Sequence, residues 1–299
     1  MNRDHTNFDT ERTRAFYRDF DEEQRLNTSH ATCIEFLTTV RLIRKYLKPE
    51  HTLLDIGAGT GVYSRYFADR GHAVSAVELS EENIQKFRDN LREDQHIDLR
   101  QGNAVDLSFY DDESFDIVLL FGPLYHLHDE ADRAKAVSEA RRVCKNDGTL
   151  FFSFINHDIV ILRETWFDPA FLQGDSYDHV SFRLENDPFV FFTVDESRRL
   201  LKDNGIDILH AVAADGPSEI LAEKLNAMDE DTFAQYLRWH WHVSEKPEML
   251  GASHHLLYAG KKSWKEALFK KLDTAFEQYT RAVRKKRGIE DRKEAPTTE

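Results

Sequence analysis

Short apolar runs alternate with amphipathic stretches along the middle of the chain. Five runs are typical of buried β-strands, at residues 53–56, 73–77, 97–100, 115–121 and 149–155. Stretches of helical character lie between them, at residues 62–70, 81–93 and 130–145. Apolar strands that alternate with helices predict an α/β fold, in which helices cover both faces of a parallel sheet.

Further elements are expected on either side of this core. The patterns predict two helices in residues 10–47, a helix at 194–204, and strands at 206–212 and 254–260. Two longer segments, 157–192 and 215–252, exceed what the sheet needs. The first is rich in aromatic residues, which can wall a water-excluding pocket or form a small packed subdomain. Both segments and the N-terminal helices can lie over the carboxyl ends of the strands.

A glycine-rich loop follows the first predicted strand. Residues 55–61 read Asp-Ile-Gly-Ala-Gly-Thr-Gly, directly before a predicted helix. Glycine allows sharp turns and a close approach of backbone to a ligand, and the helix N-terminus offers unpaired N–H groups. Glu78 ends the second predicted strand, where a carboxylate can accept both hydroxyls of a ribose. This unit predicts a site for a ribose-containing cofactor; three turn-forming glycines are the plain alternative.

The composition is that of a globular protein. Of the 299 residues, 40% are hydrophobic and 31% are charged, and the formal net charge is −14. A chain this acidic is repelled by nucleic acid and by anionic membranes unless it has a local basic patch. No run of about 18 apolar residues predicts a membrane span, and the first residues lack the apolar stretch of a secretory signal. With only Cys33 and Cys144, we expect free thiols and a cytoplasmic protein.

Positive charge is concentrated near the C-terminus. Residues 261–293 hold 12 basic and 5 acidic residues. Trp264, Leu268, Leu272 and Tyr279 recur at helical spacing and form one apolar face. We expect a helix from Ser263 to about residue 287 whose apolar face packs on the rest of the chain or on a second copy, as in a homodimer. A membrane surface and a solvent-exposed arm are the alternatives.

Four motifs follow one another from the first to the fourth predicted strand. They are Asp55 with the glycines, Glu78 followed by Leu79, Gly102-Asn103-Ala104, and Asp116. In this order they resemble the motifs of class I S-adenosylmethionine-dependent methyltransferases. The departure is Asn103, which stands where the family commonly has aspartate; an amide oxygen can still accept a hydrogen bond.

The resemblance covers residues 52–155 and implies a Rossmann-like fold. Its doubly wound, seven-stranded sheet is mainly parallel, with an antiparallel last strand. The sequence patterns predict what is added to this family's minimal domain. We expect an N-terminal helical cap at 1–48, a methyltransferase domain at 49–262 with insertions at 157–192 and 215–252, and a basic helix with a frayed tail at 263–299.

The resemblance further implies roles at the cofactor, S-adenosylmethionine. Glu78 would bind the ribose diol, Leu79 would pack on the adenine, and Asn103 and the Ala104 N–H would face its edge. The expected set is Asp55, Gly57, Ala58, Gly59, Gly61, Glu78, Leu79, Asn103, Ala104 and Phe121. Tyr17 and Arg25 are added as residues that close over the cofactor, with solvent-exposed helix positions as the alternative for both.

Candidates for the chemistry should follow the fourth strand, where an open α/β sheet places its ligand crevice. His126 has the natural pKa of a general base near neutrality, and Tyr125 can orient the acceptor. The alternative is that both only shape the pocket.

Three histidine pairs raise the question of a metal: His126/His128, His240/His242 and His254/His255. Their spacing is not that of metal-binding helices, so we expect no metal site.

The expected function is methyl transfer to O or N of a small-molecule acceptor, with S-adenosylhomocysteine as product. Seven acidic residues against Arg163 and Arg183 in the segment 157–192 favour a small molecule over nucleic acid. Two alternatives stay open: an RNA methyltransferase that uses the basic helix, and a non-catalytic S-adenosylmethionine-binding protein. A nicotinamide oxidoreductase is disfavoured because Val62 stands where its fingerprint has glycine.

Overall fold

The computed structural model describes Glu11, Thr13, Leu26, residues 28–185 and 188–263, Leu272, Phe276, Tyr279 and Thr280. The chain divides into two units, residues 1–261 and 262–299. In the second unit the four residues from Leu272 to Thr280 named above are helical. Trp264 and Leu268 of the predicted apolar face lie outside the described residues, as do Tyr17 and Arg25.

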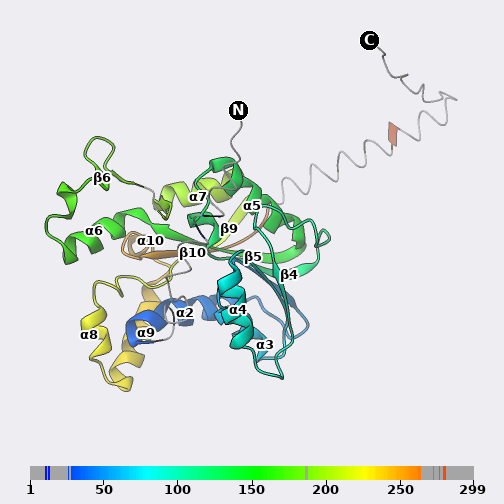
Figure 1. The fold of residues 1–299 in the computed structure, drawn as a ribbon, viewed down its shortest axis with the longest axis horizontal. Helices are drawn as coiled ribbons and strands as arrows, with labels where there is room; N and C mark the ends of the chain where they lie inside the picture. Colours follow the sequence, from blue (N-terminus) through cyan, green and yellow to red (C-terminus); the bar gives the residue numbers. More distant parts are fainter. Residues whose placement is uncertain are drawn as a thin grey trace, which may run out of the picture. The chain divides into compact units, whose positions relative to one another are not determined.

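An eight-stranded sheet forms the centre of the first unit (Figure 1). Its main path runs β3-β2-β1-β4-β5-β10-β9, and β8 pairs with β5 beside this path. The strands are β1 Thr52–Ile56, β2 Ala73–Glu78, β3 Ile97–Gln101, β4 Phe115–Leu120, β5 Cys144–Asn156, β8 Phe191–Phe192, β9 Ile206–Ala213 and β10 His255–Lys262. The pairs along β3-β2-β1-β4-β5 are parallel, and β10 is antiparallel to β5. The predicted mainly parallel sheet with an antiparallel last strand is confirmed, with β8 as an addition.

Helices cover both faces of the sheet. The helices in the described part of the chain are α2 His30–Ile43, α3 Val62–Ala68, α4 Glu81–Asp89, α5 Glu130–Val143, α6 His157–Phe167, α7 Val194–Asp203, α8 Ala222–Asn226, α9 Glu230–Val243 and α10 Pro247–Leu250. Neighbouring strand residues point to opposite faces, so Leu53 packs in a core cluster with α2 and α3, whereas Leu54 packs in one with α5 and α7. The sheet is therefore doubly wound, as predicted.

The two long insertions form separate structures on the sheet. Residues 157–192 contain α6, the short helix η3 (Phe171–Gln173) and a small antiparallel pair, β6 (Tyr177–Asp178) with β7 (Arg183–Leu184). Their core includes Tyr125 and Ile155. Residues 215–252 contain α8, α9 and α10; α8 and α9 pack on α2, as Figure 1 shows.

β5 is longer than the sequence pattern predicts. It begins at Cys144 instead of residue 149, because Cys144 pairs with Phe115 across an irregularity in the register with β4. Lys145, Asn146 and Asp147 have the composition of a turn, so the sequence pattern did not predict strand here; Lys145 Nζ donates to Asp116 Oδ2 at 2.8 Å and Asn146 Nδ2 donates to Glu113 Oε1 at 2.7 Å. Among the described residues, no helix combines the length and apolarity needed to cross a bilayer.

Candidate active site

A cavity lies at the carboxyl ends of β1, β2 and β4. It encloses about 910 Å³, part of which is open to solvent. Its walls include these residues expected at the cofactor or in the chemistry: Asp55, Gly57, Ala58, Gly59, Glu78, Leu79, Asn103, Ala104, Phe121, Tyr125 and His126. The sequence reasoning missed several other wall residues, among them Thr60, Val62, Tyr63 and Asn83. We call this space the first cavity.

The glycine loop is held in a conformation that side chains rarely adopt. Gly57 and Gly59 have φ of +77° and +56°. A Cβ on Gly57 would lie 2.7 Å from the Phe121 carbonyl oxygen and 2.6 Å from Cδ of Pro123, so the backbone segments after β1 and β4 meet here. Gly61 differs from these two: it makes room for the Phe87 ring of α4 and is not among the residues that line the first cavity.

Glu78 connects the second strand to the glycine loop. Its side chain is buried; Oε2 accepts from the Gly59 N–H at 2.7 Å, and Oε1 accepts from the Ser80 N–H at 2.8 Å. Burial raises the pKa of this carboxyl, and the backbone N–H groups of Ser80 and Gly59 act against that rise. The loop conformation therefore depends on the same carboxylate that borders the cavity.

Asp55 is the deepest carboxyl group of the first cavity. It is 1% exposed, and its Oδ2 accepts a hydrogen bond from Ser64 Oγ at 2.7 Å. Burial raises its pKa to about 6; the bond from Ser64 lowers it, and the charge of Glu78 raises it further. The ionisation of Asp55 is consequently coupled to that of Glu78.

Two buried polar atoms at the first cavity have no hydrogen-bond partner in the described part of the chain. They are Thr60 Oγ1 and Asn83 Oδ1, each in a side chain only 1% exposed. Buried polar atoms are nearly always paired with protein, water or ligand. Asn83 Nδ2 donates to Glu78 Oε1 at 3.4 Å, so the unpaired oxygen lies beside the carboxylate expected at a ribose. A ligand that carries hydroxyl groups fits these residues.

Tyr125 and His126 follow β4 on the short helix η2 (Pro123–Tyr125). Burial, with a smaller effect from His128, lowers the pKa of His126 to about 3. The His126 ring packs against Tyr125 and Phe189, with both ring centroids 5.2 Å away. A base with so low a pKa accepts a proton poorly near neutral pH, which favours the alternative that His126 shapes the pocket.

A second cavity adjoins Tyr125, which lines both spaces. It measures about 1510 Å³ including its opening to solvent. Aromatic walls come from Phe167, Phe189 and Phe191. Charged and imidazole side chains gather in it from α2, α6 and the segments around β9 and β10: Glu35, Arg163, Glu164, Asp215, Glu219, His254 and His255.

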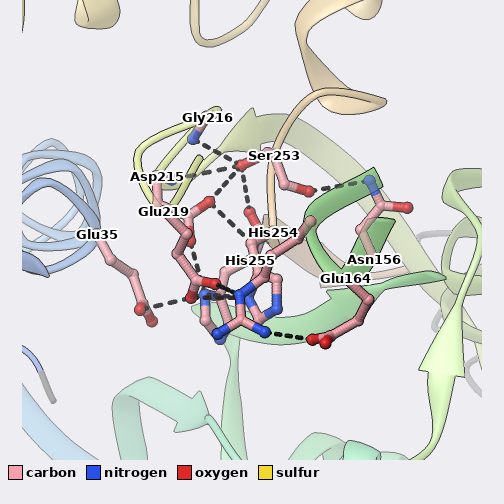
Figure 2. A network of polar contacts seen from close by, with 10 residues as sticks. Glu35, Asn156, Glu164, Asp215, Gly216, Glu219, Ser253, His254 and His255 are labelled. Atoms are coloured by element: carbon pink, nitrogen blue, oxygen red, sulfur yellow. Dashed lines mark hydrogen bonds and ion pairs between the residues drawn. The ribbon is translucent and has the colours of Figure 1, made fainter. Parts of the chain in front are cut away.

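The polar side chains of the second cavity form one network (Figure 2). His255 Nδ1 lies 2.7 Å from Asp215 Oδ2 and 3.3 Å from Glu35 Oε2. Burial and the neighbouring His255 lower the pKa of His254 to about 4. The sequence pointed to the His254-His255 pair but not to Glu35 or Asp215, which are distant along the chain.

Comparison with known proteins identifies the domain. Residues 54–152 match the family described as a methyltransferase domain. The chain contains a class I S-adenosylmethionine-dependent methyltransferase domain. The matched segment contains Asp55, the glycine loop, Glu78 and Asn103, so the residues that carry the resemblance fall inside it. S-adenosylmethionine is the cofactor of this domain.

The curated relatives share this domain. Glycine/sarcosine N-methyltransferase of Aphanothece halophytica is 29% identical over 138 residues, 46% of this chain and 50% of that protein. Ubiquinone biosynthesis O-methyltransferase of Hahella chejuensis is 32% identical over 111 residues, 37% of this chain and 45% of that protein. The chain thus spans about half the length of the curated relatives it matches.

Solved structures extend the likeness of the methyltransferase fold beyond that segment. The PH0226 protein of Pyrococcus horikoshii has a TM-score of 0.54 at 19% identity, covering 83% of this chain and 99% of that one. A methyltransferase of Thermotoga maritima, described as a possible histamine N-methyltransferase, has a TM-score of 0.52 at 19% identity, covering 83% and 98%.

Proposed function

We propose that the protein transfers the methyl group of S-adenosylmethionine to an oxygen or nitrogen atom of a small-molecule acceptor. One observation carries the proposal: the first cavity, built from the methyltransferase motifs, shares Tyr125 with a second cavity that has aromatic walls and polar groups. A methyl transfer needs a cofactor site and an acceptor site that meet at one point, because the acceptor must approach in line.

In this proposal the first cavity holds the cofactor. Glu78 and Asn83 bind the ribose hydroxyls, Leu79 and Ala104 contact the adenine, and Asn103 lies at its edge. Asn103 Oδ1 accepts from the Val105 N–H at 3.2 Å, which orients this amide at the cavity wall. When bound, the cofactor supplies an electrophilic methyl group, and this chain's residues align the acceptor and exclude water.

The second cavity holds the acceptor, with Tyr125 at the junction. The aromatic side chains of the 157–192 insertion provide apolar contact and keep water away. Of the residues that the structure describes, four carboxyl groups and one arginine line this space, which opposes the binding of nucleic acid. The small-molecule acceptor is therefore preferred to RNA. The names of the relatives include both N- and O-methyltransferases, so both acceptor atoms stay in the proposal.

We propose the cytoplasm as the location, from the two cysteines of the sequence, which are both free thiols in the structure. A homodimer through the basic C-terminal helix is the proposed assembly, on the strength of its apolar face.

The test is incubation of the full chain with methyl-labelled S-adenosylmethionine and a cell-metabolite extract. Label in a small molecule, reduced in the Glu78→Gln variant, is the expected result. Label in added RNA would contradict the small-molecule acceptor and would support an RNA methyltransferase. A protein that binds the cofactor and labels neither fraction would be a non-catalytic binder.

A further inference from the structure

Nitrogen and oxygen donors converge in the wall of the second cavity. Asp215, His254 and His255 each offer one ligand atom, and these atoms all lie within 4.8 Å of one another. Two more carboxylates approach the same imidazoles: Glu35 Oε2 is 3.3 Å from His255 Nδ1, and Glu219 Oε1 is 3.5 Å from His254 Nδ1. Figure 2 shows these side chains pointing toward one another from α2, from the segment after β9 and from the start of β10.

The spacing of these atoms suits a metal ion. Zinc binds imidazole nitrogen and carboxylate oxygen at about 2.0–2.2 Å, which puts the ligand atoms of a tetrahedral site about 3.3 Å apart. The two Nδ1 atoms of His254 and His255 are 3.3 Å apart, and the contacts to Glu35 and Glu219 measure 3.3 and 3.5 Å. Two imidazole nitrogens that face each other need a proton or a cation between them.

The charge of the cluster also calls for a cation. Glu35 and Asp215 are buried, and Glu219 adds a third carboxylate at the edge. Arg163 is the charged partner of Glu219, but it also pairs with Glu164. Buried carboxylates are stable when they are paired or bind a metal, and here one imidazole, His255, is shared between Glu35 and Asp215. A divalent ion would neutralise the excess of negative charge.

Further hydrogen bonds hold the donors in place. Ser253 Oγ donates to Asp215 Oδ1 at 2.7 Å, and the His255 backbone N–H donates to the same oxygen at 2.9 Å. Ser253 Oγ in turn accepts from the Gly216 N–H at 2.9 Å, and its carbonyl oxygen accepts from Asn156 Nδ2 at 2.9 Å. Metal ligands are commonly oriented by such outer contacts.

We propose that Asp215, His254 and His255, with Glu35 and Glu219 beside them, bind one divalent transition-metal ion such as zinc. Mixed imidazole and carboxylate donors suit zinc and its neighbours better than magnesium or calcium. On binding, the proton shared between His255 Nδ1 and Asp215 leaves to solvent, and the nitrogen lone pair bonds to the metal. An open coordination position would face the second cavity, where it can hold an acceptor oxygen or nitrogen; this last step rests on the proposed function.

The test measures metal binding without the methyl-transfer reaction. The full chain, without a histidine tag, is stripped with a chelator and dialysed against Zn²⁺; a parallel sample receives Co²⁺ for visible spectroscopy. We expect one equivalent of metal by elemental analysis, and proton release in calorimetry when buffers of different ionisation enthalpy are compared. His255→Ala and His254→Gln should each weaken binding at least tenfold. His254 is less buried than His255, so its variant tests the site if His255→Ala fails to fold.

The matched control is His210→Ala, because His210 Nδ1 lies 2.6 Å from Glu245 Oε2 in a half-buried pair that does not line the second cavity. This variant should bind metal as the native protein does. Binding below one equivalent, or binding unchanged in both His254→Gln and His255→Ala, would overturn the proposal. S-adenosylhomocysteine titrated into the stripped protein tests the cofactor site separately, so the two proposals can fail independently.

Discussion

The Glu78 carboxylate accepts a hydrogen bond from the Gly59 backbone N–H at 2.7 Å and thereby fixes the glycine loop to the end of β2. The residue expected to bind ribose is also the residue that shapes the loop beside it. Loss of this carboxylate should therefore affect both the loop and the ligand.

Glu78→Gln should weaken the binding of S-adenosylmethionine by about 1.5–3 kcal/mol, the range for a hydrogen bond to a charged group. Calorimetric titration measures the change. Glu81→Gln is the control, because Glu81 is exposed in the first turn of α4, three residues away. Equal affinities of the two variants for S-adenosylmethionine would show that Glu78 does not bind the cofactor.

Gly57→Ala should be more destabilising than Gly71→Ala. Both glycines have positive φ, +77° and +84°, so alanine is strained at either position. A Cβ at residue 71 meets nothing within 4 Å, whereas a Cβ at residue 57 collides with Pro123 and the Phe121 carbonyl. The free energy of unfolding in urea should differ between the variants by about 1–3 kcal/mol, the cost of overpacking. Equal values would mean that β1 and β4 do not approach this closely.

Asp55→Asn should change the pH dependence of stability. The pKa of Asp55 is raised from 3.8 to about 6, so the folded state holds this proton more tightly than the unfolded chain. The protonated Asp55 therefore stabilises the folded state fully when the pH is below the pKa of this group in the unfolded chain. This stabilisation is lost as the pH rises from about 4 to about 6. The variant should gain up to about 3 kcal/mol relative to the native protein between these limits. Urea unfolding along a pH series measures the difference.

Asp116→Asn is the control of opposite sign. Burial alone would raise the pKa of Asp116, but the hydrogen bonds from Lys145 and Thr52 outweigh it and lower the pKa below its ordinary value. Ionised Asp116 therefore stabilises the folded state when the pH is above the pKa of this group in the unfolded chain, and this stabilisation is lost as the pH falls. The variant lacks it, so the variant should become less stable than the native protein as the pH rises. The same trend in both variants would contradict the assigned environments.

The first cavity was predictable because its residues follow strands of one parallel sheet. Asp55, Gly57, Glu78 and Asn103 lie next to the ends of β1, β2 and β3, which share an edge of the sheet, so local motifs determine where they meet. The low pKa of His126 was not predictable, because its burial depends on the insertion that packs over η2.

The second cavity could not be derived from local patterns. Glu35 lies on α2, Asp215 follows β9, and His255 begins β10. They meet only because β10 runs antiparallel beside β5, and β9 pairs with β10 at the sheet's edge. The spacing of His254 and His255 alone gave no reason to expect a metal, since the carboxylates that complete the cluster are distant in sequence.

Truncation after Lys262 tests the proposed role of the basic C-terminal helix. Burying one large apolar side chain contributes roughly 1.5–3 kcal/mol, so a face with Trp264, Leu268, Leu272 and Tyr279 should be covered in solution. The truncated chain should melt at a lower temperature or change its mass in light scattering. Unaltered melting and mass would show that the helix is a detached arm and would reopen the RNA alternative.

Calorimetric titration of the full chain with S-adenosylmethionine and S-adenosylhomocysteine tests most directly whether the first cavity binds the cofactor. We expect one equivalent of either ligand per chain, with affinity reduced by Glu78→Gln and unaffected by Glu81→Gln. No binding of either ligand at near-millimolar concentration would contradict the assignment of the first cavity.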